Sequence, residues 1–190
     1  MAEAFTRFGI KEVADVTFYQ VEEDAASEIG VKKGEKVLKF DTLKVSNIES
    51  TAESSEARGG KGNAALISWD YGREINVTIE DALMSMDCLA LLFGDKDGDN
   101  KIVINANKFP GTYYVEGTTY ARNELDGKDH LFTFTIPKAK IQSETTLTME
   151  AEGDPTVIGM TLKVLRCKNG DMMFLERAEK SVEEMEKETE

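Results

Sequence analysis

Alternation of apolar and polar residues is the feature of this sequence that most constrains its fold. In the segment HLFTFTI, residues 130–136, every second side chain points to the same face of an extended chain: His130, Phe132, Phe134 and Ile136. Residues 75–79 repeat the pattern, with Ile75, Val77 and Ile79 on one face and Asn76 and Thr78 on the other. A period of two is typical of strands that bury one face, so this chain is predicted to be rich in antiparallel β-structure.

Turn dipeptides separate several of these segments. Asp126-Gly127 stands between TYYVEGTTYAR and HLFTFTI, and Asn169-Gly170 stands between VIGMTLKVLRC and MMFLERA. Asp-Gly and Asn-Gly favour tight hairpin turns, because the central residues of those turns need positive φ. Each dipeptide therefore predicts that its two flanking segments pair with each other.

One principal helix is expected over about residues 80–93. The period changes at EDALMSMDCLALLFG, where Thr78 and Asp81 have the spacing of a capping box and Gly94 provides a stop. The face expected to be buried consists of Ala82, Leu83, Met86, Leu89, Ala90 and Phe93.

The expected fold class is mainly β (α+β), as an antiparallel β-sandwich or a partly closed barrel with that helix on its flank. Residues 1–175 are predicted to form a single domain, since neither a linker nor an internal repeat divides them. Residues 48–64, IESTAESSEARGGKGN with its neighbours, are too polar for a core and predict an exposed arm or loop that becomes ordered on assembly. Residues 176–190 predict an acidic tail or frayed helix.

Charge and composition limit the possible functions. The formal net charge of −13 argues against binding modes that neutralise nucleic-acid phosphates. No apolar run approaches the roughly 20 residues that a membrane span needs, and MAEAFTRFGIKEV lacks the features of a signal peptide. Cys88 and Cys167 lack the spacing of metal ligands and are expected to be buried thiols.

The acidic string GDKDGDNKIVI, residues 94–104, resembles the first half of a helix-loop-helix calcium loop. Asp95, Asp97 and Asp99 occupy the first, third and fifth ligand positions. The second half does not fit, because Asn100 stands where the turn needs glycine and Ala106 where a bidentate glutamate is needed. A solvated turn is the preferred interpretation, and a weak cation site is the alternative.

No catalytic, cofactor-binding or metal-binding residue is assigned from the sequence, and the chain is expected not to be an enzyme. Residues 60–65, GKGNAA, satisfy a loose dinucleotide pattern, but a polar stretch precedes them and a strand follows. His130 is the only histidine and is interpreted as structural. Trp69 is interpreted as a core or interface residue.

The block EARGGKGNAALISWDYGREINVTIEDALMSMDCLALLFG resembles a stretch found in tail tube (major tail) structural proteins of tailed bacteriophages. The features that carry this resemblance are ARGGKGN, WDYGREI and TIEDAL, and the segments GIKEVADVTFY and VLKFDTLKVSNIESTAE agree with it. The resemblance implies two packed antiparallel sheets with a flanking helix. It also implies six-membered rings that stack into a hollow tube through which the genome passes.

On this resemblance the expected partners are further copies of the chain and other tail proteins such as sheath, terminator or baseplate. DNA would pass without specific binding, and the protein would be made in the host cytoplasm and reside in the virion tail. Two alternatives remain. One is another virion part, such as a tail terminator, baseplate or capsid-associated protein, and the other is a calcium-binding module built on Asp95, Asp97 and Asp99.

Overall fold

The computed structural model describes residues 7–10, 15–93, 96–142 and 158–182, which contain nine strands and one helix. The elements in chain order are β1 (Phe8–Ile10), β2 (Asp15–Glu23), β3 (Val31–Phe40), β4 (Leu43–Gly59), β5 (Ala64–Asp81), α1 (Met86–Phe93), β6 (Thr112–Asn123), β7 (Asp129–Ile141), β8 (Ile158–Val164) and β9 (Phe174–Ser181). This confirms a mainly β fold with one principal helix.

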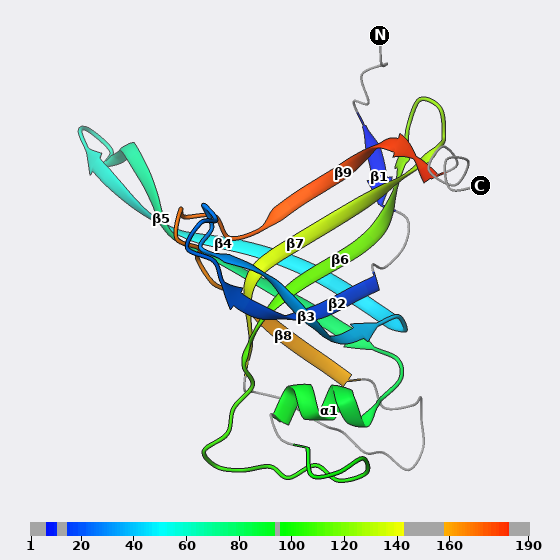
Figure 1. Ribbon diagram of the computed structural model, residues 1–190. Helices are drawn as coiled ribbons and strands as arrows, with labels where there is room; N and C mark the ends of the chain where they lie inside the picture. The colour runs from blue at the N-terminus through cyan, green and yellow to red at the C-terminus, as the bar shows by residue number, and fades with distance from the viewer. Residues whose placement is uncertain (1–6, 11–14, 94–95, 143–157, 183–190) are drawn as a thin grey trace, which may run out of the picture.

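The strands form one antiparallel sheet that is strongly twisted and does not close (Figure 1). Its main path runs β3-β2-β6-β7-β8-β5-β4, while β1 pairs with β6 and β9 pairs with β7. The path therefore ends in two different strands, β3 and β4, each of which pairs with a single strand among the described residues. Helix α1 lies at one end of the sheet.

The predicted alternation is present in the core. Val77 and Ile79 in β5 are fully buried, as are Val16 and Phe18 in β2 and Ile136 in β7. The β6–β7 hairpin at Asp126-Gly127 is also confirmed. Gly127 has φ 68°, and the Lys128 backbone N–H donates to Asp126 Oδ1 at 3.0 Å.

The helix starts later than the sequence indicates, and its predicted buried face is partly right: Leu89 and Phe93 pack against the core, whereas Leu83 is exposed. Residues 80 and 81 belong to β5, and the buried Asp81 accepts a hydrogen bond from the Thr42 hydroxyl instead of capping a helix. The cap is Ser85, whose Oγ accepts from the Cys88 N–H at 3.1 Å. The buried residues are Cys88, Leu91 and Leu92. The capping-box pattern was misleading because it specifies only a spacing of three residues. Thr78 and Asp81 have that spacing, but both lie in β5.

The hairpin predicted around Asn169-Gly170 is wrong in its pairing. The turn itself is present, with Gly170 at φ 103° and a hydrogen bond of 2.8 Å from Cys167 N to Asp171 O. However, β8 pairs with β5 and with residues 139–141 of β7, whereas β9 pairs with residues 130–135 of β7. Because β5 and β7 occupy both edges of β8, that strand has no free edge for β9.

The first residues of the predicted tail, which starts at residue 176, lie in a strand. Residues 174–181 form β9, and Ser181 at its end is buried. Residues 183–190 lie outside the described residues, and the division into one domain and a tail stays a prediction. Among the described residues, no helix is long and apolar enough to cross a membrane.

Candidate functional site

The most exposed feature of the described chain is the outer half of the β4–β5 hairpin. Residues 49–74, which we name the arm, are exposed except for the half-buried Ala57 and Gly59. The arm projects away from the rest of the sheet (Figure 1). A four-residue turn, 60–63, closes it, with positive φ at Gly60, Gly62 and Asn63 and a hydrogen bond of 3.2 Å from Asn63 N to Gly60 O.

A β-bulge marks the place where the arm leaves the core. Thr51 faces Glu74 and Glu53 faces Tyr71, so β5 has two residues, Gly72 and Arg73, where β4 has one. Gly72 has φ 64°, a conformation that an L side chain rarely adopts. Bulges increase the local twist of a hairpin, so this one separates the orientation of the arm from that of the buried part of β5.

An apolar stripe runs along one face of the arm. Ile67, Trp69 and Tyr71 alternate along β5, and each is 54% exposed. The residues that face them in β4 are Ala57, Ser55 and Glu53, which provide no large apolar cover. Aromatic side chains that remain this exposed are typical of protein–protein contact surfaces.

The sequence predicted an exposed polar arm or loop at 48–64, and the structure places these residues in β4, the turn and the start of β5. The arm continues to residue 74. It is already a hydrogen-bonded hairpin in the single chain, so ordering on assembly is not needed to form it. The sequence left Trp69 as core or interface, and its exposure rules out the core. The stripe itself was missed, although the alternation in LISWDYG is the signal for it.

The candidate calcium ligands are only partly described, because Asp95 lies outside the described residues. The Asp97 carboxylate is paired with Lys101, with 2.6 Å between Oδ2 and Nζ, and the Asp97 N–H donates to Lys101 O at 2.9 Å. Across the described ranges, no group of three or more His, Cys, Asp or Glu side chains is arranged to hold a metal ion. The Asp97–Lys101 pair supports the interpretation of this segment as a solvated turn.

The dinucleotide-like pattern at 60–65 forms the tip of the arm. Two antiparallel strands flank it, so the strand-turn-helix geometry that cradles a phosphate is not present there. The nearby Arg58 pairs with Glu56, with 2.8 Å between Nε and Oε2.

The two cysteines and the histidine are buried. Cys88 and Cys167 are both buried and free. Burial, together with the charge of Asp81, raises the pKa of the Cys88 thiol to about 12, and burial also raises the pKa of Cys167. His130 is buried in β7, with Nδ1 3.2 Å from the carbonyl oxygen of Ala178 in β9. Neither thiol has the lowered pKa that makes a cysteine reactive.

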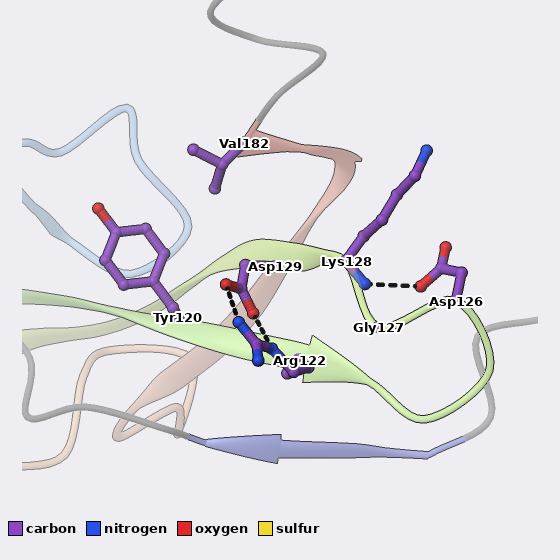
Figure 2. Close-up of a pocket in the computed structure, with 7 residues that line it drawn as sticks. All are labelled: Tyr120, Arg122, Asp126, Gly127, Lys128, Asp129 and Val182. Carbon is purple, nitrogen blue, oxygen red and sulfur yellow. Dashed lines mark hydrogen bonds and ion pairs between the residues drawn. The ribbon is translucent and has the colours of Figure 1, made fainter.

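A depression of 560 Å³ lies at the end of the β6–β7 hairpin (Figure 2). Its lining residues are Tyr120, Arg122, Asp126, Gly127, Lys128, Asp129 and Val182. Arg122 and Asp129 face each other across the two strands and form a bidentate ion pair, with both N–O distances at 2.7 Å. Since this pair directs its charges at each other, it fastens the end of the hairpin.

The described residues form an open antiparallel sheet with one helix and a protruding hairpin arm. The chain belongs to the YomU/Tube protein family, whose model matches residues 8–97 and 95–175. This match confirms the resemblance found in the sequence, so the chain is a phage tube-like structural protein and a virion component.

Among solved structures, the chain is similar to one in the "Cryo-EM structure of the anti-feeding prophage (AFP) baseplate, 6-fold symmetrised". The TM-score is 0.47 at 19% identity, and the alignment covers 89% of this chain and 97% of that one. A comparison with curated proteins gave no match.

Proposed function

We propose that this protein is the repeating subunit of a phage tail tube. Copies assemble into rings, six-membered as the family resemblance implies, and the rings stack around a channel for DNA. The role is mechanical and involves no catalysis. Sheath, terminator and baseplate proteins are the proposed further partners, which would meet the tube along its length or at its ends.

The observation that carries this proposal is the apolar stripe of Ile67, Trp69 and Tyr71 on the arm. Exposed apolar surface is unfavourable in water, at roughly 25 cal/mol per Å². The stripe has no cover within its own hairpin, and the arm holds it away from the rest of the sheet. In a family of tube proteins, burial against another copy removes this cost, and Trp and Tyr are the residues that dominate such contacts.

The charge of the chain is suited to a conduit. A formal net charge of −13 per subunit, repeated around a ring, repels the phosphates of DNA on average. Repulsion keeps DNA from adhering to the wall during transit. The proposal therefore includes the absence of specific DNA binding.

Negative-stain electron microscopy over a concentration series tests the assembly, with light scattering on the same samples. Trp69 is the only tryptophan, so its fluorescence reports on the arm. We expect stacked rings or tubes, and a blue shift of the emission as they form. Monomers at every concentration would contradict the proposal, and complexes of fixed size that need another tail protein would favour a terminator or baseplate role.

A further inference from the structure

We propose that the sheet face that points away from the core binds a carboxylate-rich segment of another tail protein. The surface extends over five neighbouring strands of the sheet path, β3, β2, β6, β7 and β8. This surface is separate from the arm and its apolar stripe, so the inference goes beyond the proposed contact between copies and rests on the proposed function only for the class of partner. We name it the lysine face, and it consists of Lys33, Lys36, Lys39, Lys140, Lys163, Tyr19 and Tyr114.

The strand register places the residues of β2, β3 and β6 on one side of the sheet. Tyr19 alternates with fully buried residues of β2 and therefore points away from the core. Lys36 is opposite Tyr19 in β3, and Tyr114 is opposite it in β6. Register shifts in β3 bring Lys33 and Lys39 to the same side as Lys36. Three lysines and two aromatic rings thus share this half of the lysine face.

Lys140 in β7 and Lys163 in β8 extend the lysine face across the sheet. Each lies between two buried apolar residues of its own strand, so both point away from the core. They are directly opposite each other in the β7–β8 pairing, and like charges in that position destabilise a sheet. A carboxylate placed between the two ammonium groups replaces this repulsion with attraction. This part of the lysine face is therefore better stabilised when an anionic group is bound.

Two of the five lysines, Lys36 and Lys140, have no ion pair among the described residues. An ammonium group has three donors, so the lysines that are already paired can each serve a second carboxylate. In a chain with a formal net charge of −13, this cluster provides the local positive charge that an acidic segment needs. The existing pairs are Lys33–Glu116 at 2.8 Å, Lys39–Asp15 at 2.7 Å and Lys163–Glu74 at 2.9 Å.

The two tyrosines add a rigid aromatic platform to the lysine face. The rings of Tyr19 and Tyr114 pack edge to face, with 6.4 Å between their centroids. Lys33 Nζ lies 4.5 Å from the centroid of the Tyr19 ring, where the ring attracts a cation. Both rings are partly exposed. Exposed tyrosine is enriched in contacts with polypeptides, so the platform favours a protein ligand.

The size of the lysine face is suited to a short segment. Strands β3 and β8 are four strand spacings apart, and the lysines of β3 are opposite about four residues of β2, so the face measures roughly 19 by 13 Å. The resulting area of about 250 Å² is well below the roughly 800 Å² that each partner buries in a standard protein–protein interface. An extended segment of about six residues spans roughly 20 Å. Such a segment reaches from β3 to β8.

Duplex DNA is the other polyanion that a lysine surface can bind. Its phosphates form continuous rows of negative charge, and these rows would also meet the carboxylates of Glu116, Asp15 and Glu74. The carboxylates of a protein segment are spaced and can be placed opposite lysines alone, which is how charge patterns select a partner. We therefore assign the lysine face to a protein segment.

Fluorescence anisotropy with a labelled deca-glutamate peptide at low ionic strength tests the lysine face. The folded chain should bind this peptide, and added salt should weaken the binding. Lys36→Gln/Lys140→Gln breaks no ion pair among the described residues, and we expect it to raise the Kd roughly tenfold or more. Lys36→Gln alone repeats the test with a single exposed side chain. The matched control, Lys61→Gln/Lys101→Gln, changes the net charge equally at exposed positions outside the lysine face and should leave the Kd unchanged.

Three results would overturn the inference. They are the absence of peptide binding by the wild-type chain, equal Kd values for the test and control variants, and tighter binding of a duplex DNA probe than of the peptide. The last result would assign the lysine face to nucleic acid instead. An absence of rings and tubes in electron microscopy would contradict the proposed function alone, because the peptide titration needs only the folded subunit.

Discussion

Gly117 of β6 lies directly under the aromatic ring of Phe134 of β7, its partner across the two strands. A Cβ atom at Gly117 would overlap ring atoms Cζ and Cε1 of Phe134. Phe134 is buried and belongs to the central apolar cluster. The missing side chain at residue 117 is therefore what leaves room for the ring of Phe134.

Gly117→Ala is expected to lower the free energy of unfolding by about 1–3 kcal/mol, the usual cost of overpacking a core. Urea unfolding measures this change. Gly159→Ala in β8 is the matched control, since its nearest neighbour would be Glu80 Cγ at an ordinary 3.9 Å. Adding Phe134→Leu to Gly117→Ala should recover part of the loss. An equal loss in both alanine variants would contradict the role of the ring.

Trp69→Ala is expected to weaken assembly while leaving the folded subunit almost unchanged. The side chain is 54% exposed in the single chain, so its removal should alter the free energy of unfolding by no more than about 0.5 kcal/mol. If Trp69 is an anchor of the contact between copies, its removal should weaken the free energy of association by about 2 kcal/mol or more. Leu66→Ala is the control. Leu66 is 68% exposed and precedes Ile67 in the sequence, but it lies outside the stripe. The check is light scattering over a concentration series, and equal effects of both variants would reject the stripe as a contact surface.

Calcium is expected to leave the melting temperature unchanged. A ligand that binds only the folded state raises it through linkage, but the Asp97 carboxylate is held by Lys101, and Ala106 stands where the bidentate glutamate is needed. Calorimetric titration with calcium and thermal melts with and without it provide the measurement. A saturable heat that disappears in Asp97→Asn would establish the cation site.

Alkaline pH is expected to destabilise the protein through Cys88. Its pKa is raised from 9.0 to about 12 in the folded chain, chiefly by burial. Above pH 9 the unfolded chain releases this proton while the folded chain retains it, so the unfolded state binds fewer protons. The free energy of unfolding should then fall as pH rises, by up to about 1.4 kcal/mol per pH unit from this group.

Urea unfolding at pH 8 and at pH 10.5 measures this loss. Cys88→Ala should show a smaller pH-dependent loss than wild type, whatever its stability at pH 8. Cys167, also buried with a raised pKa, provides the comparison, and Cys167→Ala should retain the contribution of Cys88. If Cys88→Ala loses as much unfolding free energy between pH 8 and pH 10.5 as wild type does, the loss does not come from Cys88.

Local sequence patterns predicted the parts of the fold that depend on neighbouring residues. The strands at 75–79 and 130–136 and the turn at Asp126-Gly127 were predicted because burial alternates along a strand and a hairpin turn needs positive φ. The β8–β9 hairpin was wrong because a turn dipeptide does not determine which edges are free. Those edges depend on β5, which ends more than 90 residues before β9 begins.

The arm was half predicted for a similar reason. Its polarity indicated exposure, but whether residues 48–64 form a loop or a strand depends on the pairing with residues 64–74. The lysine-rich face of β3 escaped the sequence analysis entirely. Lys33, Lys36 and Lys39 are spaced by three residues, a spacing that does not align side chains on a regular strand, and only the register shifts in β3 bring them to one face.

The hairpin of β4 and β5 also bears on the order of events during synthesis. Its strands are joined by four residues, so the arm can form soon after residue 81 leaves the ribosome. The pairing of Asn76 with Lys163 must wait for another 163 − 76 = 87 residues, and such non-local pairs form slowly. Trp69 and its neighbours are then displayed before the core is complete. Nascent copies that lie close together could aggregate through this exposed stripe. The polar residues that surround the stripe therefore also protect the growing chain from aggregation.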